Sequence, residues 1–538
     1  MKKYILCIKK FIVLQLLFDA VCAVLMAMIP YFNKVLFDKI LSNRYPMKMF
    51  IQVIILYLLC ILLHWIFSYL TSICIWKGAI RFETELKKDF FSAVIKLPYS
   101  KFHSKTVGEY LSIQGNDIVA LEQDYLEPIL DIIKSSNMLM IYGIIIWNLL
   151  GTNITMLILG LSILAILVPK ITAKTLARYQ NEYLKENGSY VNVMKQFLEG
   201  FSLINARTFV AINRRHHNKI EQVAKKRYRY GRMKTLTLTT SGTAVNVISF
   251  LLFILIGLLL IKGSMTVGTA VAGFGYLQCF IEPIESILYD ISAIHSVKDI
   301  KKKILEMIQT KEHDNKKQIH SIERIEMKNI DYKNQKFELK NIQCTFERGK
   351  KYAIIGGNGS GKTTLLKLLL NYIESDKGEI LFIENINLIH RICEGERKVD
   401  LSSVIYYMEQ QSILFDDTIE NNLSIYGTYQ KEQWEKGVDL LPKKKWEEIK
   451  NRPSGLALSG GEKQLLAIAR MIASDSQVYI MDEPFSAMDK KTADYMQQKL
   501  LQLEDKMVIM ITHKTDEDSL ALFDHVYEMR DGSLYEWK

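Results

Sequence analysis

The residues from Gly356 to Thr364 read GGNGSGKTT, and this stretch decides how the C-terminal part of the chain folds. It has the form G-x-x-x-x-G-K-[ST], in which glycines let backbone N–H groups converge on phosphate oxygens. A short apolar run, residues 351–355, precedes the stretch, and a leucine-rich run follows it. Strand, loop and helix N-terminus in this order predict a phosphate-binding loop within a parallel α/β domain.

Each position of the loop has an expected role in holding a nucleotide. Lys362 is expected to reach the β- and γ-phosphates, and the hydroxyl of Thr363 is expected to be a magnesium ligand. The predicted nucleotide-binding residues are Gly356, Gly357, Asn358, Gly359, Ser360, Gly361, Lys362, Thr363 and Thr364. ATP and Mg²⁺ are therefore the expected ligands of this domain.

A second apolar run, residues 478–481, ends in the carboxylate pair Asp482 and Glu483. Two carboxylates at a strand end are often only a cap of the next element. Downstream of a phosphate loop they suit phosphoryl transfer, so we expect Asp482 to hold Mg²⁺ through water and Glu483 to polarise the attacking water.

Between these elements lies Leu458-Ser459-Gly460-Gly461-Glu462, which opens a predicted helix. A serine hydroxyl, two glycines and a helix N-terminus make a second phosphate clamp, although a plain serine N-cap explains the same residues locally. The order resembles the Leu-Ser-Gly-Gly-Gln signature of ABC ATPases. The resemblance implies that Ser459, Gly460, Gly461 and Glu462 contact the nucleotide held by an opposite subunit. Glu462 replaces the usual Gln, and we expect its carboxylate to face and repel the partner's γ-phosphate.

Further positions extend the resemblance. Gln410 resembles the loop glutamine that couples magnesium to the transmembrane helices, residues 486–489 resemble the loop between two ATP sites, and His513 resembles the histidine at the γ-phosphate. The resemblance implies catalytic roles for Glu483, His513 and Gln410, magnesium ligation by Thr363, Gln410 and Asp482, and nucleotide contact by Asp489. The adenine-stacking aromatic falls at Tyr332 or Asn334, and we favour Tyr332.

Charge and hydropathy divide the 538-residue chain into two halves. Of its 69 basic and 58 acidic residues, 30 and 36 lie in residues 321–538, which leaves 39 and 22 in residues 1–320 together with the long apolar runs. A basic and apolar half indicates a membrane domain with Lys and Arg in its cytosolic loops, and not a nucleic-acid partner. Seven scattered cysteines with no CxxC pair indicate neither a disulfide framework nor a zinc site.

Six apolar runs are candidate membrane-spanning helices, since a span needs about 20 such residues. They lie near residues 11–32, 50–76, 136–150, 154–172, 243–261 and 267–291. The interval Lys170–Lys234 carries 15 basic and 4 acidic residues. Placing it in the cytosol places both termini there too, in a multi-pass protein of the plasma membrane, most consistent with a bacterial one.

The predicted domains are a transmembrane domain at 1–297, a linker at 298–321 and an ABC ATPase domain at 322–538. Within the first domain, residues 97–117 and 197–204 resemble the two cytosolic loops through which ABC exporters contact their ATPases. The linker is rich in Lys and shows no long apolar stripe.

The chain as a whole resembles a half-size ABC exporter, a six-helix all-α transmembrane domain followed by an α/β P-loop ATPase. The resemblance implies ATP-driven export by a dimer, with a homodimer preferred over a heterodimer, in contact with membrane lipid. A bacteriocin-like or modified peptide is the favoured substrate, multidrug or lipid export is the alternative, and an ATP-gated channel or sensor is a different class. Candidate substrate residues are the ionisable groups inside apolar runs, Asp19, His64, Glu282 and Glu285.

Overall fold

The computed structural model describes residues 1–40, 47–309, 317–334, 337–385, 388–392 and 399–537. Within α7–α10, the side chains at 149–150, 153–154, 157–159, 161–173, 238, 241, 244–245, 248, 252 and 277–278 lie outside the description. The chain divides into a helical unit, Met1–Ile95 with Thr106–Thr310, and a sheet unit, Lys96–Lys105 with Lys311–Lys538. We describe each unit by itself.

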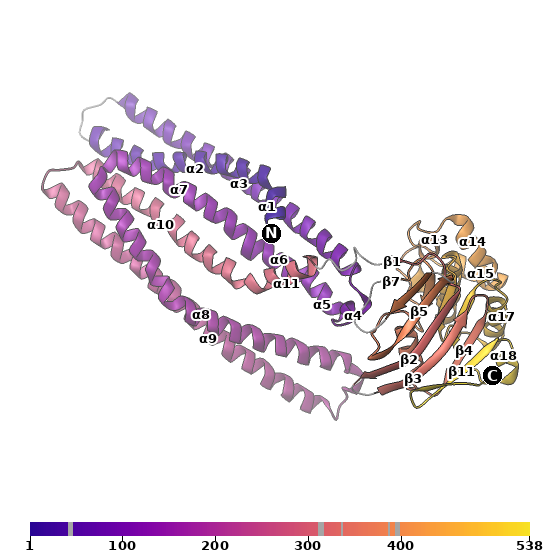
Figure 1. Ribbon diagram of the computed structural model, residues 1–538. Coiled ribbons are helices and arrows are strands. Elements are labelled where there is room, and N and C mark those ends of the chain that lie inside the picture. Colours follow the sequence, from indigo (N-terminus) through magenta and orange to yellow (C-terminus); the bar gives the residue numbers. More distant parts are fainter. Residues whose placement is uncertain (41–46, 310–316, 335–336, 386–387, 393–398, 538) are drawn as a thin grey trace. The chain divides into compact units, whose positions relative to one another are not determined.

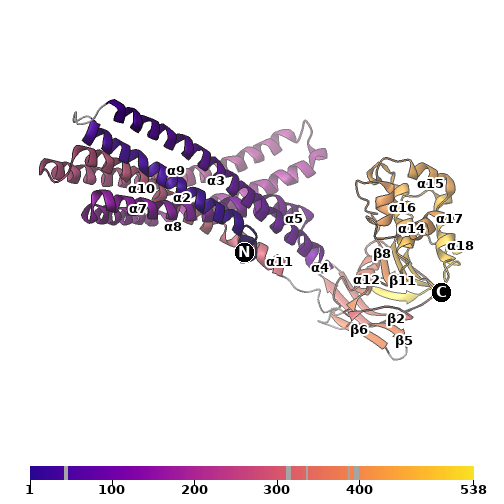
Figure 2. The ribbon, with the colours of Figure 1, turned by 90° about the horizontal axis from the view of Figure 1, so that it is seen from above.

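The helical unit consists of long helices (Figures 1 and 2). They are α1 (Lys2–Cys7), α2 (Lys9–Val35), η1 (Leu36–Ile40), α3 (Met47–Ile95), α5 (Val107–Ser112), η2 (Ile113–Asp117), α6 (Ile118–Leu121), η3 (Glu122–Leu126), α7 (Glu127–Leu150), α8 (Thr152–Glu199), η4 (Phe201–Leu203), α9 (Phe209–Ile261), α10 (Val267–Ser296) and α11 (Lys298–Gln309). Buried side chains of α2, α7 and α10 form one apolar core, and within it the Tyr276 hydroxyl donates a 2.8 Å hydrogen bond to the carbonyl of Ala27.

Three helical stretches of the described residues are long and apolar enough to cross a membrane: Lys9–Ile40, Met47–Ile95 and Val107–Asn148. The predicted span 154–172 lies on α8, mostly at positions whose side chains are outside the description. The predicted spans 243–261 and 267–291 lie on α9 and α10, which also contain such positions.

Helices α8 and α9 run side by side as an antiparallel pair beyond their apolar segments (Figures 1 and 2). Two ion pairs cross between them, Lys219 with Glu186 and Lys226 with Glu182, at 2.5 and 2.7 Å. At the turn between the helices, Leu198, Phe201 and Leu203 are each more than 60% exposed. The pair therefore ends in an uncovered apolar tip.

The structure corrects the expectation for the first half of the linker. Residues 298–309 form α11, whose Ile304 is fully buried against the helical unit. The ammonium of Lys301 lies 4.5 Å from the ring centroid of Tyr125, and Lys303 pairs with Asp117 at 3.4 Å. The i, i+4 spacing of Ile300, Ile304 and Ile308 gives the apolar stripe that the sequence analysis overlooked.

The described residues of the sheet unit form three sheets. The largest has the order β12-β11-β4-β10-β9-β8, parallel except for β12, and a second has the antiparallel order β3-β2-β5-β6. The strands are β1 (Lys317–Gln318), β2 (Arg324–Asn334), β3 (Phe337–Glu347), β4 (Lys351–Gly356), β5 (Lys377–Asn385), β6 (Leu388–Ile392), β7 (Val399–Asp400), β8 (Ile405–Met408), β9 (Val478–Asp482), β10 (Met507–Ile511), β11 (His525–Arg530) and β12 (Ser533–Glu536). Strands β1 and β7 pair alone.

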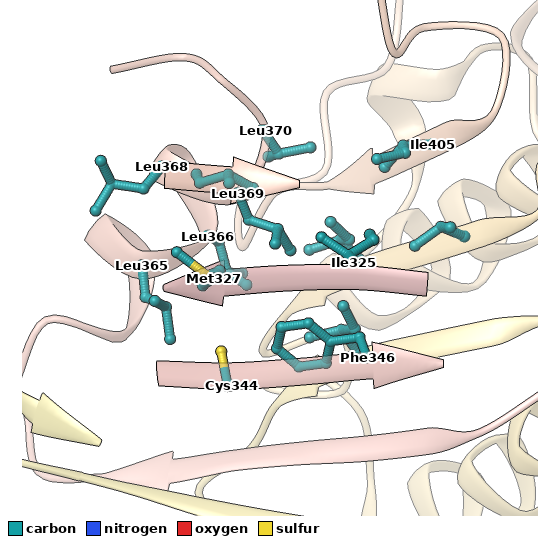
Figure 3. Close-up of a cluster of buried hydrophobic side chains, with 14 of the residues drawn as sticks. Ile325, Met327, Cys344, Phe346, Leu365, Leu366, Leu368, Leu369, Leu370 and Ile405 are labelled. Atoms are coloured by element: carbon teal, nitrogen blue, oxygen red, sulfur yellow. The ribbon is translucent and has the colours of Figure 1, made fainter. Parts of the chain in front are cut away.

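The sheet unit also contains helices. They are α4 (Tyr99–Phe102), α12 (Lys362–Leu369), α13 (Ile419–Ser424), α14 (Lys431–Asp439), α15 (Lys443–Lys450), η5 (Gly455–Ala457), α16 (Gly460–Ala473), α17 (Lys490–Leu501) and α18 (Glu517–Leu520). Figure 3 shows Leu365 and Leu366 of α12 in one buried cluster with Met327 of β2 and Cys344 of β3. A second core packs α16 and α17 on the opposite face of the parallel sheet. The predicted combination of an all-α unit and an α/β unit is thereby confirmed.

Candidate active site

One edge of the parallel sheet carries some of the predicted site residues. Strands β4, β8, β9 and β10 all point the same way, so the loops that follow them emerge at the same edge. Those loops carry the phosphate loop, Gln410, Glu483 and His513 respectively. Ligands of open α/β sheets bind at the carboxyl ends of the strands, and this edge is where the chain gathers its polar groups.

The phosphate loop needs its glycines for conformation and for space. Gly356, Gly359 and Gly361 all have positive φ angles, 146°, 80° and 107°. A Cβ atom on Gly361 would collide with the ring of Phe337, and one on Gly356 would collide with the carbonyl of Met529. The sequence therefore has no alternative to glycine at these positions.

The phosphate loop has hydrogen-bond donors that are placed to bind an anion. Helix α12 begins at Lys362 with no side-chain cap, and the Oγ atom of Ser360 is buried without a hydrogen-bond partner in the described part of the chain. The ammonium of Lys362 donates to the carbonyls of Gly356 and Gly357 at 2.8 and 2.9 Å. Burial lowers the pKa of Lys362, and the nearby Glu483 and Asp482 act in the opposite direction. An orphaned hydroxyl at an uncapped helix N-terminus fits a phosphate group.

Thr363 and Asp482, both expected to bind Mg²⁺, are in direct contact. The hydroxyl of Thr363 donates a 2.8 Å hydrogen bond to Oδ2 of Asp482. Asp482 is only 4% exposed, and burial raises its pKa against the effect of that hydrogen bond. A hydroxyl and a buried carboxylate are hard oxygen donors of the kind Mg²⁺ prefers, so the residues present fit the ion.

Glu483 occupies a strained position between two partners. Its φ angle is +50°, and its backbone N–H donates to the carbonyl of Ile511. The amide of Gln410 donates to Oε2 of Glu483 at 2.8 Å, and Nε2 of His513 lies 2.6 Å from Oε1. Residues separated by 73 and 30 positions in sequence thus hold one carboxylate in a single orientation.

The signature helix α16 is closed by a capping box. The backbone N–H of Ser459 donates to Oε2 of Glu462 at 2.7 Å, and the N–H of Glu462 donates to the Ser459 hydroxyl at 3.4 Å. This geometry corrects the expectation that the Glu462 carboxylate faces outward towards a partner's ATP. The side chain turns back because its own helix start offers it an N–H donor, and it is 6% exposed.

Arg452 completes the surroundings of Glu462. Its Nη2 atom lies 3.3 Å from Oε1 of Glu462. Burial acts against the charge of Glu462, but the hydrogen bonds from Ser459 and the charge of Arg452 together hold its pKa below the ordinary value. Arg452 belongs to none of the motifs identified in the sequence.

A second missed residue, Gln464, joins the signature helix to residues 486–489. Its amide donates to the hydroxyl of Ser486 at 2.9 Å, and its carbonyl oxygen accepts from the N–H of Ala487 at 3.0 Å. Gln464 is 4% exposed. Asp489, the predicted nucleotide contact of that loop, accepts hydrogen bonds from the backbone and side chain of Thr492 and so caps α17. The only sequence signal for Gln464 is its place beside a buried apolar run.

Tyr332 lies half-buried on β2 opposite Leu339 of β3, and Asn334 lies at the exposed end of the same strand. Tyr332 packs against the apolar core of the sheet unit, which leaves one part of its ring uncovered. A second aromatic side chain, that of Phe337, lies against the phosphate loop at Gly361. Sequence reasoning did not single out Phe337.

The segment 96–105 packs within the sheet unit. The ring of Tyr99 stacks on Tyr372 with centroids 4.1 Å apart and planes 8° apart, and His103 stacks on the other side at 3.8 Å. Tyr372 in turn meets the edge of Tyr407 on β8, three residues before Gln410. An aromatic column therefore leads from this segment towards the active site.

The four candidate substrate residues lie on α2, α3 and α10, and the described structure records no hydrogen bond or ion pair between any two of them. Asp19 is 1% exposed and accepts a 3.2 Å hydrogen bond from Thr71, while its Oδ2 atom has no partner among the described residues. His64 is half-buried, and Glu282 and Glu285 are exposed. The structure does not bring these residues into one cluster.

Comparison with known families covers both units. A family described as ABC transporter transmembrane region matches residues 12–284, and one described as ABC transporter matches residues 339–486. The second match includes the phosphate loop, the signature stretch and both carboxylates of β9.

Curated relatives resemble the chain over most of its length. It is 25% identical over 479 residues to the probable multidrug resistance ABC transporter ATP-binding/permease protein YheH of Bacillus subtilis (strain 168), covering 83% of this chain and 68% of the relative. It is 26% identical over 518 residues to the lactococcin-G-processing and transport ATP-binding protein LagD of Lactococcus lactis subsp. lactis, covering 90% and 70%.

Among solved structures, the chain resembles that of a bacterial Atm1-family ABC exporter with ATP bound. The TM-score is 0.83 at 18% identity, over 98% of this chain and 94% of the other. At this identity the likeness shows a common fold.

Proposed function

The chain belongs to the ABC transporter family, and we propose that it works as one half of a dimer that exports a peptide. ATP hydrolysis in the sheet unit drives transport through the helical unit. The observation that carries the hydrolytic part is the geometry at Glu483, whose carboxylate is held between Gln410 and His513 at hydrogen-bond distance.

The residues of the site divide the work of hydrolysis. Glu483 would orient and take the proton of the attacking water, and the amide of Gln410 and the ring of His513 fix its two oxygens. Lys362 would exchange its carbonyl partners for phosphate oxygens. Mg²⁺, held by Thr363 and Asp482, would neutralise charge on the phosphates when bound.

Two features support a dimer. The N-terminus of α16 is a phosphate clamp with no phosphate loop of its own, so a nucleotide held by a second copy would complete it. The apolar tip formed by Leu198, Phe201 and Leu203 is exposed in the single chain, and exposed apolar patches mark partner surfaces. A homodimer suffices because Glu483 and His513 are both present.

Peptide export is favoured over drug or lipid export. The support is the similarity to LagD, named for lactococcin G transport, while the similarity to YheH, named for multidrug resistance, supports the alternative. We propose that Asp19, a buried carboxylate of α2, recognises substrate. The basic interval 170–234 supports cytosolic placement of both termini at the plasma membrane.

Inside-out vesicles that contain the purified protein test the proposal. ATP should drive accumulation of a labelled hydrophobic peptide against its gradient, and the Glu483→Gln protein should not support it. Accumulation of a cationic dye or a fluorescent lipid in place of the peptide would favour the alternative. ATP hydrolysis with no uphill movement of any probe would favour a channel or sensor. Mass spectrometry of material that co-purifies with the Glu483→Gln protein would identify the substrate.

A further inference from the structure

The signature helix carries a negative charge where it is expected to receive a phosphate. Glu462 lies in the first turn of α16, is 6% exposed and keeps its pKa below the ordinary value, so it is ionised at neutral pH. A carboxylate near a helix N-terminus is favourable for the helix. For an approaching anion it has the opposite effect, because it cancels the positive end of the helix dipole and repels the ligand.

Arg452 supplies the compensating charge, and its place is fixed by backbone contacts. Its N–H donates to the carbonyl of the fully buried Ile449 at the end of α15. Further along the segment, the N–H of Gly455 donates to the carbonyl of Asp417, and Gly455 packs so closely on Phe415 that a side chain would not fit. The 451–455 segment is therefore anchored at both ends.

The Arg452 guanidinium has more N–H donors than its ion pair with Glu462 uses. Its Nη2 lies 3.3 Å from Oε1 of Glu462, and this is the ion pair that the structure records for it in the described residues. Guanidinium has five N–H donors, and the side chain of Arg452 is 47% exposed. The positive group therefore stands between a buried carboxylate and the open surface at the start of α16.

We propose that Arg452 is a positioning residue for the phosphate clamp of α16: it neutralises Glu462, so that the helix N-terminus remains able to attract the terminal phosphate of a nucleoside triphosphate held by a second copy of the chain. This inference rests on the proposed dimer. Glu462 closes the helix end without ligand, and Arg452 removes the electrostatic penalty of that closure.

A charge series on the purified full-length protein tests the proposal. The ATP concentration for half-maximal hydrolysis is measured for wild type, Arg452→Gln, Glu462→Gln and the double variant, in which the pair carries charges of 0, −1, +1 and 0. Arg452→Gln should raise the requirement about fivefold to twentyfold, as expected of one partly screened unit charge at about 7 Å. Glu462→Gln should lower it about twofold to fivefold, because glutamine still completes the capping box. The double variant should return to within about threefold of wild type.

Three further measurements separate an effect of charge from damage to the fold. Lys450→Gln removes a neighbouring cation that pairs with Glu447 at 2.6 Å and should leave the requirement unchanged. Binding of a fluorescent ATP analogue to the phosphate loop of the same chain should be equal in all variants. Raising the salt concentration from 0.05 to about 0.5 M should compress the whole series, because screening weakens exposed charges.

The outcomes decide between this inference and the proposed function. An Arg452→Gln defect that persists in the double variant, or an unchanged curve in Arg452→Gln, would overturn the charge argument. Oligomeric state with ATP is measured in parallel in the Glu483→Gln background. If no variant dimerises, the proposed function fails. If all variants dimerise at the same ATP concentration, only the role of Arg452 fails.

Discussion

Two helix N-termini in the sheet unit, those of α12 and α16, are both suited to phosphate, and they are built in opposite ways. Among the residues that the structure describes, helix α12 has no side-chain cap, and the Ser360 hydroxyl beside it has no hydrogen-bond partner. Helix α16 is closed by Ser459 and Glu462. At the first end the ligand must satisfy the donors, whereas at the second the capping box already satisfies the N–H groups of Ser459 and Glu462.

This difference indicates a division of roles. The N-terminus of α12, here called the open end, depends on its nucleotide for a complete set of hydrogen bonds. This suits tight binding of the nucleotide within one chain. The N-terminus of α16, here called the closed end, is stable without a ligand and can therefore bind and release one repeatedly. The Ser459 hydroxyl accepts a hydrogen bond from the N–H of Glu462 and so belongs to the cap itself.

The largest expected effect is on the rate of ATP hydrolysis at the open end. Glu483→Gln should lower the ATPase rate roughly 10²–10⁴-fold, because the general base is lost, while ATP binding to α12 persists. Steady-state hydrolysis and equilibrium binding of an ATP analogue measure the two quantities. Residual activity above about a tenth of wild type would remove Glu483 from its assigned role.

Lys362→Ala should come next, since it removes the cation of the open end. Charge-assisted hydrogen bonds contribute about 1.5–3 kcal/mol each, so the loss of two should weaken ATP binding at least about a hundredfold. Isothermal titration with ATP measures the affinity. Lys340→Ala, at an exposed position of β3, serves as the control and should bind normally. Equal affinities for the two variants would contradict the assignment of Lys362.

Tyr332→Ala should have a smaller effect on the same end. Stacking of a base on an aromatic ring contributes about 1–3 kcal/mol, so the ATP requirement should rise roughly fivefold to a hundredfold with little change in the maximal rate. Tyr332→Phe should behave as wild type. If Phe337→Ala reproduces the defect and Tyr332→Ala does not, the adenine platform is Phe337.

The smallest expected effect is on the stability of the nucleotide-free protein, in which one serine at each helix N-terminus is replaced by alanine. Ser459→Ala should destabilise by about 1 kcal/mol through loss of the helix cap. Ser360→Ala should not destabilise, because its hydroxyl has no partner to lose among the described residues, and it should instead weaken ATP binding. Thermal unfolding followed by intrinsic fluorescence measures both variants. A larger loss of stability for Ser360→Ala would invert the comparison.

Most of the features that could be predicted from the sequence came from motifs of contiguous residues. The strand, loop and helix around Lys362 follow from local pattern, and the parallel sheet then brings Gln410, Glu483 and His513 to one edge because strand direction is shared. The pairing of Thr363 with Asp482 follows from the same topology. These features need no knowledge of side-chain rotamers.

The contacts that the sequence could not predict depend on side-chain orientation. Glu462 was expected to point outward, and only its three-dimensional surroundings show that the Ser459 N–H and Arg452 draw it back. Gln464 belongs to no motif, and its partners lie 22 and 23 residues away. Helix α11 was overlooked because its lysines outnumber its isoleucines, although the isoleucine spacing was present.

The stacking of Tyr99 on Tyr372 limits how this protein can exchange parts with its relatives. Residues 96–105 are flanked on both sides by sequence of the helical unit but pack with the sheet unit. A recombination event that replaces only the residues after 310 would give Tyr99 a foreign neighbour. We therefore expect inheritance to keep the two segments together, and a functional chimera to need both crossovers.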